Sequence, residues 1–182
     1  MGLAKSAMRL ASFLALGLHG LACDRTPVSE SPVDGGAEDS DCPEEESPLA
    51  FGTPETLDVV TWNIETFPKS GQATVGSVAE ILAGLDVDLF ALQEISGVAV
   101  FEQMVAHMPG WEGYLDSEWY GGLAYLYRTD TIQVRAQYEI YTTEEYWTAF
   151  PRSPQVMEFQ FQDQDLVVIN NHFKCCGDGV LD

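Results

Sequence analysis

Two strand patterns joined by one helical pattern, between residues 57 and 94, set the fold of this chain. Residues 57–68 are an extended run of β-formers closed by a proline, and residues 87–94 carry an unbroken apolar run that predicts burial on both faces. Between them, apolar residues recur at helical spacing: Val75, Val78, Ala79, Leu82 and Leu85. A strand–helix–strand unit makes its two strands parallel. We therefore expect Asn63 and Glu94, near the carboxyl ends of the strands, to share one edge of a sheet.

These two polar residues suggest different chemistry. A lone asparagine at a strand end commonly satisfies a turn, although its amide can also bind a cation or a phosphate oxygen. Glu94 ends a buried strand, and a carboxylate at such an edge suggests a magnesium ligand. Thr-Trp-Asn-Ile at 61–64 and Leu-Gln-Glu at 92–94 resemble motifs of the endonuclease/exonuclease/phosphatase family, the metal-dependent phosphoesterases related to pancreatic deoxyribonuclease.

Three later segments resemble motifs of the same family. Residues 121–128 resemble a core strand that precedes a basic residue, and residues 150–154 resemble an Arg-x-Pro segment. Arg152 in the second segment is either a bidentate phosphate clamp or a turn residue paired with a neighbouring acid. Residues 167–174 are an apolar strand that runs into an Asn-His-x-Lys motif. The resemblance implies that His172 helps to bind the scissile phosphate or transfers a proton.

The remaining elements are predicted from periodicity and turn signals. A second amphipathic helix is expected to begin with Ser96 as its N-cap and to stop at Pro109-Gly110. The short connections between the strand candidates that follow predict antiparallel pairing. These candidates are residues 113–116, 122–128, 132–141, 155–161 and 166–171. Tyr125, Tyr127 and Trp147 are expected to be packing residues rather than to stack on a substrate.

The resemblance implies a four-layer α/β/β/α sandwich with helices outside and two packed sheets inside. Members of the family use further motifs, an Asp-x-Asn and a closing Asp-His, which this sequence does not contain. We therefore expect residues 57–182 to be the N-terminal half of such a domain, and the chain to be an inactive fragment. We also expect the first sheet to present an apolar face to water.

The N-terminal 22 residues are laid out as a secretory signal peptide. Two basic residues precede an apolar stretch over residues 10–18 that is too short to span a bilayer. Gly-Leu-Ala-Cys at 20–23 resembles a bacterial lipoprotein box, in which Cys23 becomes a lipidated N-terminus. Plain cleavage after Ala22 is the alternative, because the usual branched residue is absent from position 20. The expected location is therefore a periplasmic or cell-surface membrane anchor, or secretion.

Residues 23–56 are predicted to be an acidic, disordered tether. From residue 24 on, the segment carries ten acidic residues against one arginine and almost nothing apolar to bury. Beyond Cys23, the chain has three cysteines, Cys42, Cys175 and Cys176. The two neighbours seldom bridge each other, so a link from one of them to Cys42, or to a partner, is expected.

Charge favours a small substrate over duplex DNA. Residues 57–182 hold a net charge of −14 out of −21 for the chain, with only five basic residues. A protein that grips a long polyanion shows a basic face. The phosphoester substrate is expected to be a small molecule, a lipid head group or a nucleic acid, and the charge favours the first two over duplex DNA. A saline habitat is the alternative explanation, because screening there makes net charge uninformative.

The resemblance implies metal-assisted hydrolysis of phosphoesters. Mg²⁺, or Mn²⁺ in its place, would be held by Glu94 and by oxygens from the missing half. Asn63 would orient the phosphate or the attacking water, His172 would stabilise charge or protonate the leaving group, and Arg152 would add a phosphate contact. Glu65 is expected to be solvated.

Two other hypotheses compete with a phosphoesterase function. The protein could be a non-catalytic surface lipoprotein that acts as an interaction module, or a cation scavenger that uses the acidic tether. No protein partner is inferred.

Overall fold

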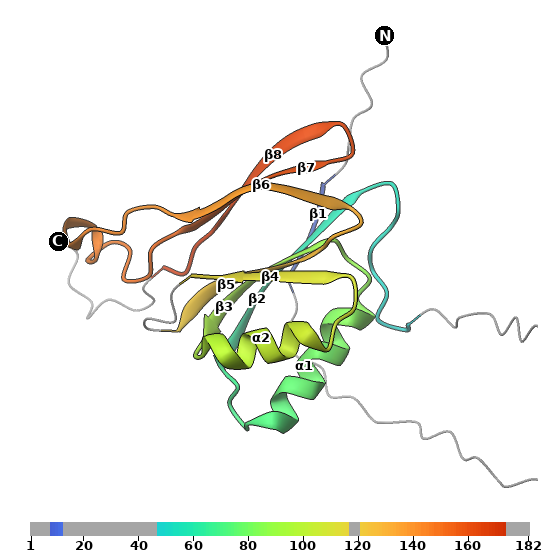
Figure 1. Ribbon diagram of the computed structural model, residues 1–182, viewed down its shortest axis with the longest axis horizontal. Coiled ribbons are helices and arrows are strands. Elements are labelled where there is room, and N and C mark those ends of the chain that lie inside the picture. The colour runs from blue at the N-terminus through green and yellow to red at the C-terminus, as the bar shows by residue number, and fades with distance from the viewer. Residues whose placement is uncertain (1–7, 13–46, 117–120, 174–182) are drawn as a thin grey trace, which may run out of the picture.

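The computed structural model describes residues 8–12, 47–116 and 121–173, which form three layers (Figure 1). Two helices, α1 (Gln72–Gly84) and α2 (Val98–Ala106), cover one face of a five-stranded sheet. A three-stranded sheet covers its other face. An α/β/β arrangement of this kind corresponds to three layers of the expected α/β/β/α sandwich.

The five-stranded sheet is mixed and has the order β1-β2-β3-β5-β4. Its strands are β1 (Met8–Ser12), β2 (Leu57–Phe67), β3 (Leu89–Ile95), β4 (Trp111–Leu115) and β5 (Gly122–Arg128). Strands β2 and β3 are parallel, with Asn63 opposite Gln93, so the predicted strand–helix–strand unit is confirmed. Strand β5 runs antiparallel to both β3 and β4. Asn63 and Glu94 therefore lie at the same edge, as the sequence predicts.

The three-stranded sheet is antiparallel and consists of β6 (Ile132–Glu139), β7 (Gln155–Phe161) and β8 (Gln164–Asn170). The antiparallel prediction fails at the connection from β5 to β6, because β6 leaves the first sheet and starts the second. In β7 the sequence predicts one buried face, Met157, Phe159 and Phe161, and this is confirmed. The opposite face was expected to be wet, but Val156 on it is buried, while Glu158 and Gln160 are partly exposed. The loop between β6 and β7 contains a 3-10 helix, η1 (Glu144–Tyr146).

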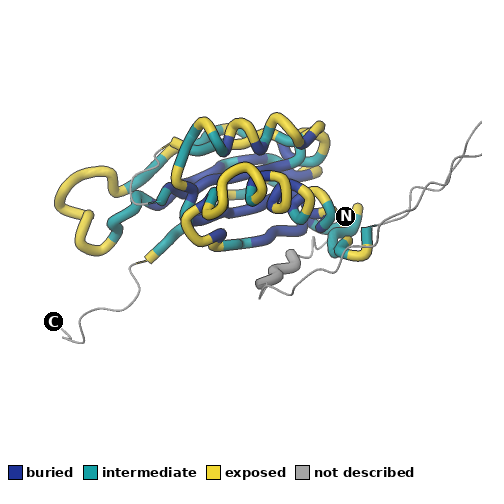
Figure 2. Tube along the Cα trace, turned by 90° about the horizontal axis from the view of Figure 1, so that it is seen from below, coloured by how far each residue is buried: buried dark blue, intermediate teal, exposed yellow. Residues whose placement is uncertain are grey.

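Two hydrophobic clusters lie on either side of the five-stranded sheet. Helix residues such as Leu82 and Phe101 pack on one face of the sheet, while Tyr125 and Phe159 belong to the cluster between the sheets. In Figure 2 the strands are buried and the outer turns of the elements are exposed. Tyr125 and Tyr127 are buried, as predicted, whereas Trp147 is 57% exposed on the β6–β7 loop. The packing role predicted for Trp147 is therefore wrong.

The apolar surface left in water lies on the second sheet and not on the first. The first sheet has a layer on each face, contrary to expectation. On β8 the outward side chains Val167 and Ile169 are 63% and 49% exposed. The difference arises because the second sheet already covers the face that was expected to be bare.

The N-cap of α2 is Gly97 rather than the predicted Ser96. The Ser96 backbone N–H donates to the Phe67 carbonyl oxygen at 2.9 Å, so Ser96 still follows the sheet edge. Helix α2 also ends at Ala106, before the predicted stop at Pro109-Gly110. The next turn is closed by hydrogen bonds from His107 to Met104 and from Met108 to Val105.

The ordered domain begins before the predicted boundary at Leu57. Leu49 and Phe51 pack against the core, and the Phe51 N–H donates to the Leu85 carbonyl oxygen at 2.9 Å. A Cβ at Gly52 would lie 1.7 Å from the Asp86 carbonyl oxygen, so only glycine permits this close approach. The composition of residues 47–56, which is poor in apolar residues, predicts a tether, but these few contacts hold the segment on the domain.

Strand β1 lies inside the segment predicted to be a signal peptide and pairs in parallel with β2. Cleavage after residue 22 would remove β1 and leave β2 at the edge of the sheet, so the signal peptide stays a prediction. The predicted lipidation at Cys23, the tether up to residue 46 and the other three cysteines lie outside the described residues. Among the helices that are described, none has the length and apolar character needed to cross a membrane.

Candidate functional site

Glu94 is held at the end of β3 by two hydrogen bonds. Its Oε1 accepts from the Asn63 side-chain amide at 2.9 Å, and its Oε2 accepts from the Thr66 N–H at 3.0 Å. The Glu94 backbone has φ +66°, a left-handed conformation that costs a non-glycine residue about 1–3 kcal/mol. A Cβ at Gly121 would lie 3.2 Å from the Glu94 Cα, so glycine there lets the start of β5 approach Glu94 closely.

Asn63 has both roles that its position suggests. Its side-chain oxygen accepts from the Glu65 N–H at 2.9 Å, which is a turn contact, while its amide nitrogen fixes the Glu94 carboxylate. The next carboxylate along the chain, Glu65, is exposed and pairs with Lys69, so it is solvated as expected. Asn63 therefore orients the acidic group of this edge.

His172 reaches the same edge from the other sheet, two residues after the end of β8. Its Nε2 lies 3.7 Å from Glu94 Oε1 and 3.5 Å from the Asn63 amide nitrogen. Burial, and then the positive charge of Arg152, lower the pKa of His172 below its ordinary value, while Glu94 acts in the opposite direction. The lowered pKa favours the neutral form of the His172 ring over an ion pair with Glu94.

Arg152 lies beside this group and supports the start of β5. Its Nε donates to the Gly121 carbonyl oxygen at 3.2 Å, which links the Arg152 loop to the residue that contacts Glu94. Its charge acts on His172. The structure thus brings all four sequence-predicted residues of the domain, Asn63, Glu94, Arg152 and His172, to one end of the molecule. Arg152 thus donates to a backbone oxygen that is distant in sequence, and its charge also acts near the site.

Two buried residues that the sequence analysis missed connect the sheets directly beneath the site. The Gln93 side-chain amide donates to the Asn170 side-chain oxygen at 2.8 Å, and Asn170 in turn donates to the Leu92 carbonyl oxygen at 2.9 Å. The Tyr125 hydroxyl accepts from the Asn170 N–H at 2.8 Å. Gln93 and Asn170 lie one and two residues before Glu94 and His172. The sequence does carry a signal for them, because Gln93 and Asn170 are polar residues near the ends of apolar strands.

The site offers one carboxylate to a metal ion. Among the described residues, no three histidine, cysteine, aspartate or glutamate side chains gather closely enough to hold one. Glu94 nevertheless suits Mg²⁺, because its side chain is 24% exposed and supplies the hard oxygen ligand that this ion prefers. Mg²⁺ commonly binds proteins through one or two carboxylates and keeps several waters.

Comparison with known proteins agrees with this geometry. Residues 60–174 match the profile of the Endonuclease/Exonuclease/phosphatase family, a range that includes Asn63, Glu94, Arg152 and His172. The chain belongs to this family. No curated protein sequence matches the chain significantly.

Solved structures show that the described fold is a partial endonuclease/exonuclease/phosphatase fold. TDP2 of D. rerio with a single-strand DNA product superposes with a TM-score of 0.55 at 17% identity, over 66% of this chain and 47% of that one. Truncated TDP2 of Caenorhabditis elegans gives a TM-score of 0.50 at 18% identity, over 65% and 46%. The chain thus spans about half the length of the structures that it matches, and at these identities the likeness concerns the fold alone.

Proposed function

We propose that this domain contributes a Mg²⁺-assisted site for phosphoester hydrolysis at the edge formed by Asn63, Glu94 and His172. The observation that supports it is the convergence of a carboxylate and a neutral imidazole from two different sheets, 3.7 Å apart, in a member of a phosphoesterase family. The strained backbone at Glu94 adds to this, because such strain is kept where the surrounding structure holds a functional group in place.

Each side chain has a defined task in this proposal. Glu94 would be one ligand of Mg²⁺, which supplies Lewis-acid polarisation of a phosphoryl oxygen when bound. Asn63 keeps the carboxylate turned toward the ion through its 2.9 Å hydrogen bond. His172 would stabilise an anionic oxygen in front of Glu94 or transfer a proton to it, and Arg152 adds positive charge for the same group.

Binding of inorganic phosphate to the full chain in the presence of Mg²⁺ tests these roles. We expect phosphate to shift the NMR signals of the His172 ring, and Arg152→Gln to weaken this effect several-fold. Arg135→Gln is the matched control, because Arg135 is exposed on the second sheet and donates to Gln160 at 2.7 Å. Equal weakening by both variants, or no effect on His172, would contradict the proposed site.

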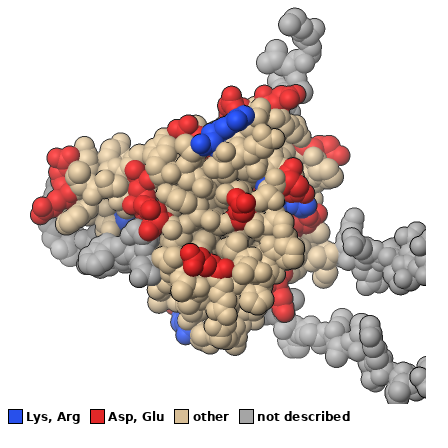
Figure 3. Space-filling model, viewed as in Figure 1, with Lys and Arg blue, Asp and Glu red and all other residues tan. Residues whose placement is uncertain are grey.

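The proposed substrate is a small phosphodiester or a lipid head group rather than duplex DNA. The domain has a net charge of −14, and Figure 3 shows acidic side chains at many places on the visible face and basic ones at few. Binding to duplex DNA needs phosphate-contacting lysine and arginine residues. The single-strand DNA product in the D. rerio TDP2 structure belongs to that protein.

We also propose that the protein is exported and anchored through Cys23. The lipobox-like residues 20–23, followed by an acidic segment, support this location. Metabolic labelling with radioactive palmitate should mark the wild type and leave Cys23→Ser unmarked. Absence of label from both proteins would instead indicate a non-lipidated form.

A non-catalytic role as a surface interaction module is the second candidate function, favoured by the single carboxylate at the described site.

A further inference from the structure

A pocket of about 250 Å³ lies next to the proposed phosphoester site. Arg152 lines it and connects it to that site through the 3.2 Å hydrogen bond to Gly121. Its other polar and aromatic walls are Glu139, Thr142, Trp147 and Ser153. Pockets for drug-sized ligands measure about 300–1,000 Å³, so this one suits a small group attached to the phosphate.

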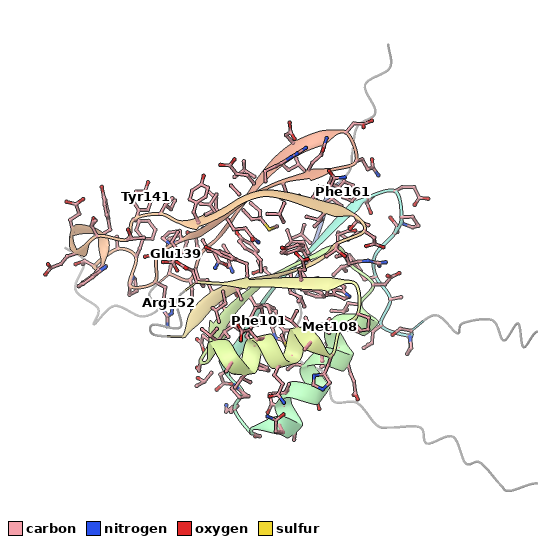
Figure 4. The ribbon with its side chains drawn as sticks, in the orientation of Figure 1. Phe101, Met108, Glu139, Tyr141, Arg152 and Phe161 are labelled. Atoms are coloured by element: carbon pink, nitrogen blue, oxygen red, sulfur yellow. The ribbon has the colours of Figure 1, made fainter. Side chains whose placement is uncertain are left out.

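Glu139 gives this pocket a partly buried negative charge. It is the last residue of β6, and Figure 4 shows it between Tyr141 and Arg152. Burial raises the pKa of Glu139, and the nearby charge of Asp116 raises it further. Within the described residues, no hydrogen bond contributes to this shift. An ionised Glu139 is therefore favoured by positive charge in the pocket, which Arg152 in the pocket wall or a bound cation can supply.

Trp147 gives the same pocket an aromatic wall. It follows η1, and it is 57% exposed; among the large hydrophobic side chains described, only Val167 and Phe173 are more exposed. The loop around it is folded by ring contacts, with Tyr141 stacked on Phe150 at 5.0 Å and tilted against Tyr146 at 4.7 Å. An indole face beside a carboxylate attracts organic cations, because the ring quadrupole and the acid act on the same charge.

We propose that this pocket binds the cationic end of an amino-alcohol phosphate, with the ammonium group between Glu139 and Trp147 and the phosphate near Arg152 and His172. This inference deepens the proposed phosphoesterase function and rests on it for the placement of the phosphate. Glu139 and Arg152 give the wall of one pocket opposite charges, and these charges match a zwitterion. A nucleobase would stack on Trp147 but would not neutralise the charge of Glu139.

Binding of phosphocholine tests this against its neutral carbon isostere, 3,3-dimethylbutyl phosphate. The signal is the Trp147 indole N–H in the NMR spectrum of the full chain, without added metal. We expect phosphocholine to bind at least about tenfold more tightly than the isostere, and Glu139→Gln to abolish this preference. Glu144→Gln removes a charge from the neighbouring loop outside the pocket and should keep the preference.

Three outcomes would overturn the inference. They are equal binding of phosphocholine and the isostere, an unchanged preference in Glu139→Gln, and tighter binding of cytidine 5′-monophosphate that does not depend on Glu139. Choline alone separates this inference from the proposed function. If choline shifts Trp147 while no divalent ion binds at Glu94, the pocket stands and the hydrolytic site fails. If a divalent ion binds at Glu94 while choline has no effect, the pocket fails and the site stands.

Discussion

His172 is held neutral by its surroundings, and its role follows from that state. Burial and the Arg152 charge both lower its pKa. A neutral imidazole donates a hydrogen bond without the desolvation penalty of a buried cation. A neutral His172 ring therefore suits the binding of a phosphoryl oxygen better than a ring held in a permanent ion pair with Glu94.

The lowered pKa of His172 should be visible in how the melting temperature of the protein depends on pH. Because the folded pKa of His172 lies below its unfolded value of about 6.5, its contribution to stability is present above that pH and is lost as pH falls through the folded pKa. We expect the difference in melting temperature between pH 7.5 and pH 5 to shrink in His172→Gln. An NMR titration of the ring should give a midpoint below 6.5 that rises in Arg152→Gln. A midpoint above 6.5 in the wild type would be inconsistent with the neutral state.

Individual residues differ in how far the sequence predicts them. Glu94 lies next to the end of one apolar strand and His172 lies two residues beyond another, so their position at a sheet edge follows from local pattern. Trp147 was mispredicted because burial depends on contacts between distant segments, and the β6–β7 loop turns its indole outward. The pairing of Asn63 with Glu94 depends on the left-handed backbone at Glu94, which no local pattern indicates.

Strands β3 and β8 belong to different sheets, yet they carry the two halves of the site. The buried hydrogen bond between Gln93 and Asn170, 2.8 Å long, fixes one strand relative to the other. Buried polar groups tend to specify a single arrangement when all their partners are present. We infer that this pair sets the distance between Glu94 and His172.

Replacement of Asn170 by alanine should therefore loosen the contact between the sheets. It removes hydrogen bonds to Gln93, Leu92 and Ala124, and each polar group left unpaired costs about 1–3 kcal/mol of the free energy of unfolding. Urea denaturation measures the loss. Asn171→Ala is the matched control, because its side chain makes one exposed 3.4 Å contact, and its cost should stay within about 0.5 kcal/mol. Similar losses in both variants would show that the buried link is unimportant.

The elements themselves were largely predictable, because the periodicities of β2, α1, β3 and α2 are strong and local. The sheet to which each strand belongs was harder to predict from the sequence. The turn between β5 and β6 has the length of a hairpin connection, but the chain changes sheets there. Whether a strand pairs with its neighbour or crosses to a second layer is decided by the core between the sheets, around Tyr125 and Phe159.

The whole molecule combines a family fold with a single described carboxylate at its site. One carboxylate holds and orients a catalytic ion weakly, and positioning contributes effective molarities of about 10⁵ M or more in complete sites. Binding and catalysis should therefore separate in this chain.

Residues 24–182 alone should be catalytically silent. With Mg²⁺ or Mn²⁺, hydrolysis of bis-p-nitrophenyl phosphate and nicking of plasmid DNA should stay at background. Glu94→Ala and His172→Ala should be indistinguishable from the wild type in both assays. Turnover that both substitutions abolish would instead show that the described residues are a sufficient enzyme.

The central claim is that Glu94 and its neighbours form a divalent-cation site next to His172. Paramagnetic broadening by Mn²⁺ in the NMR spectrum of ¹⁵N-labelled protein tests it most directly, since it detects weak binding without catalysis. We predict that the amide signals of Thr66, Glu94 and His172 broaden at the lowest Mn²⁺ concentrations, and that Glu94→Gln removes this effect while Glu65→Gln does not. Broadening that begins elsewhere on the acidic surface, or that survives in Glu94→Gln, would contradict the claim.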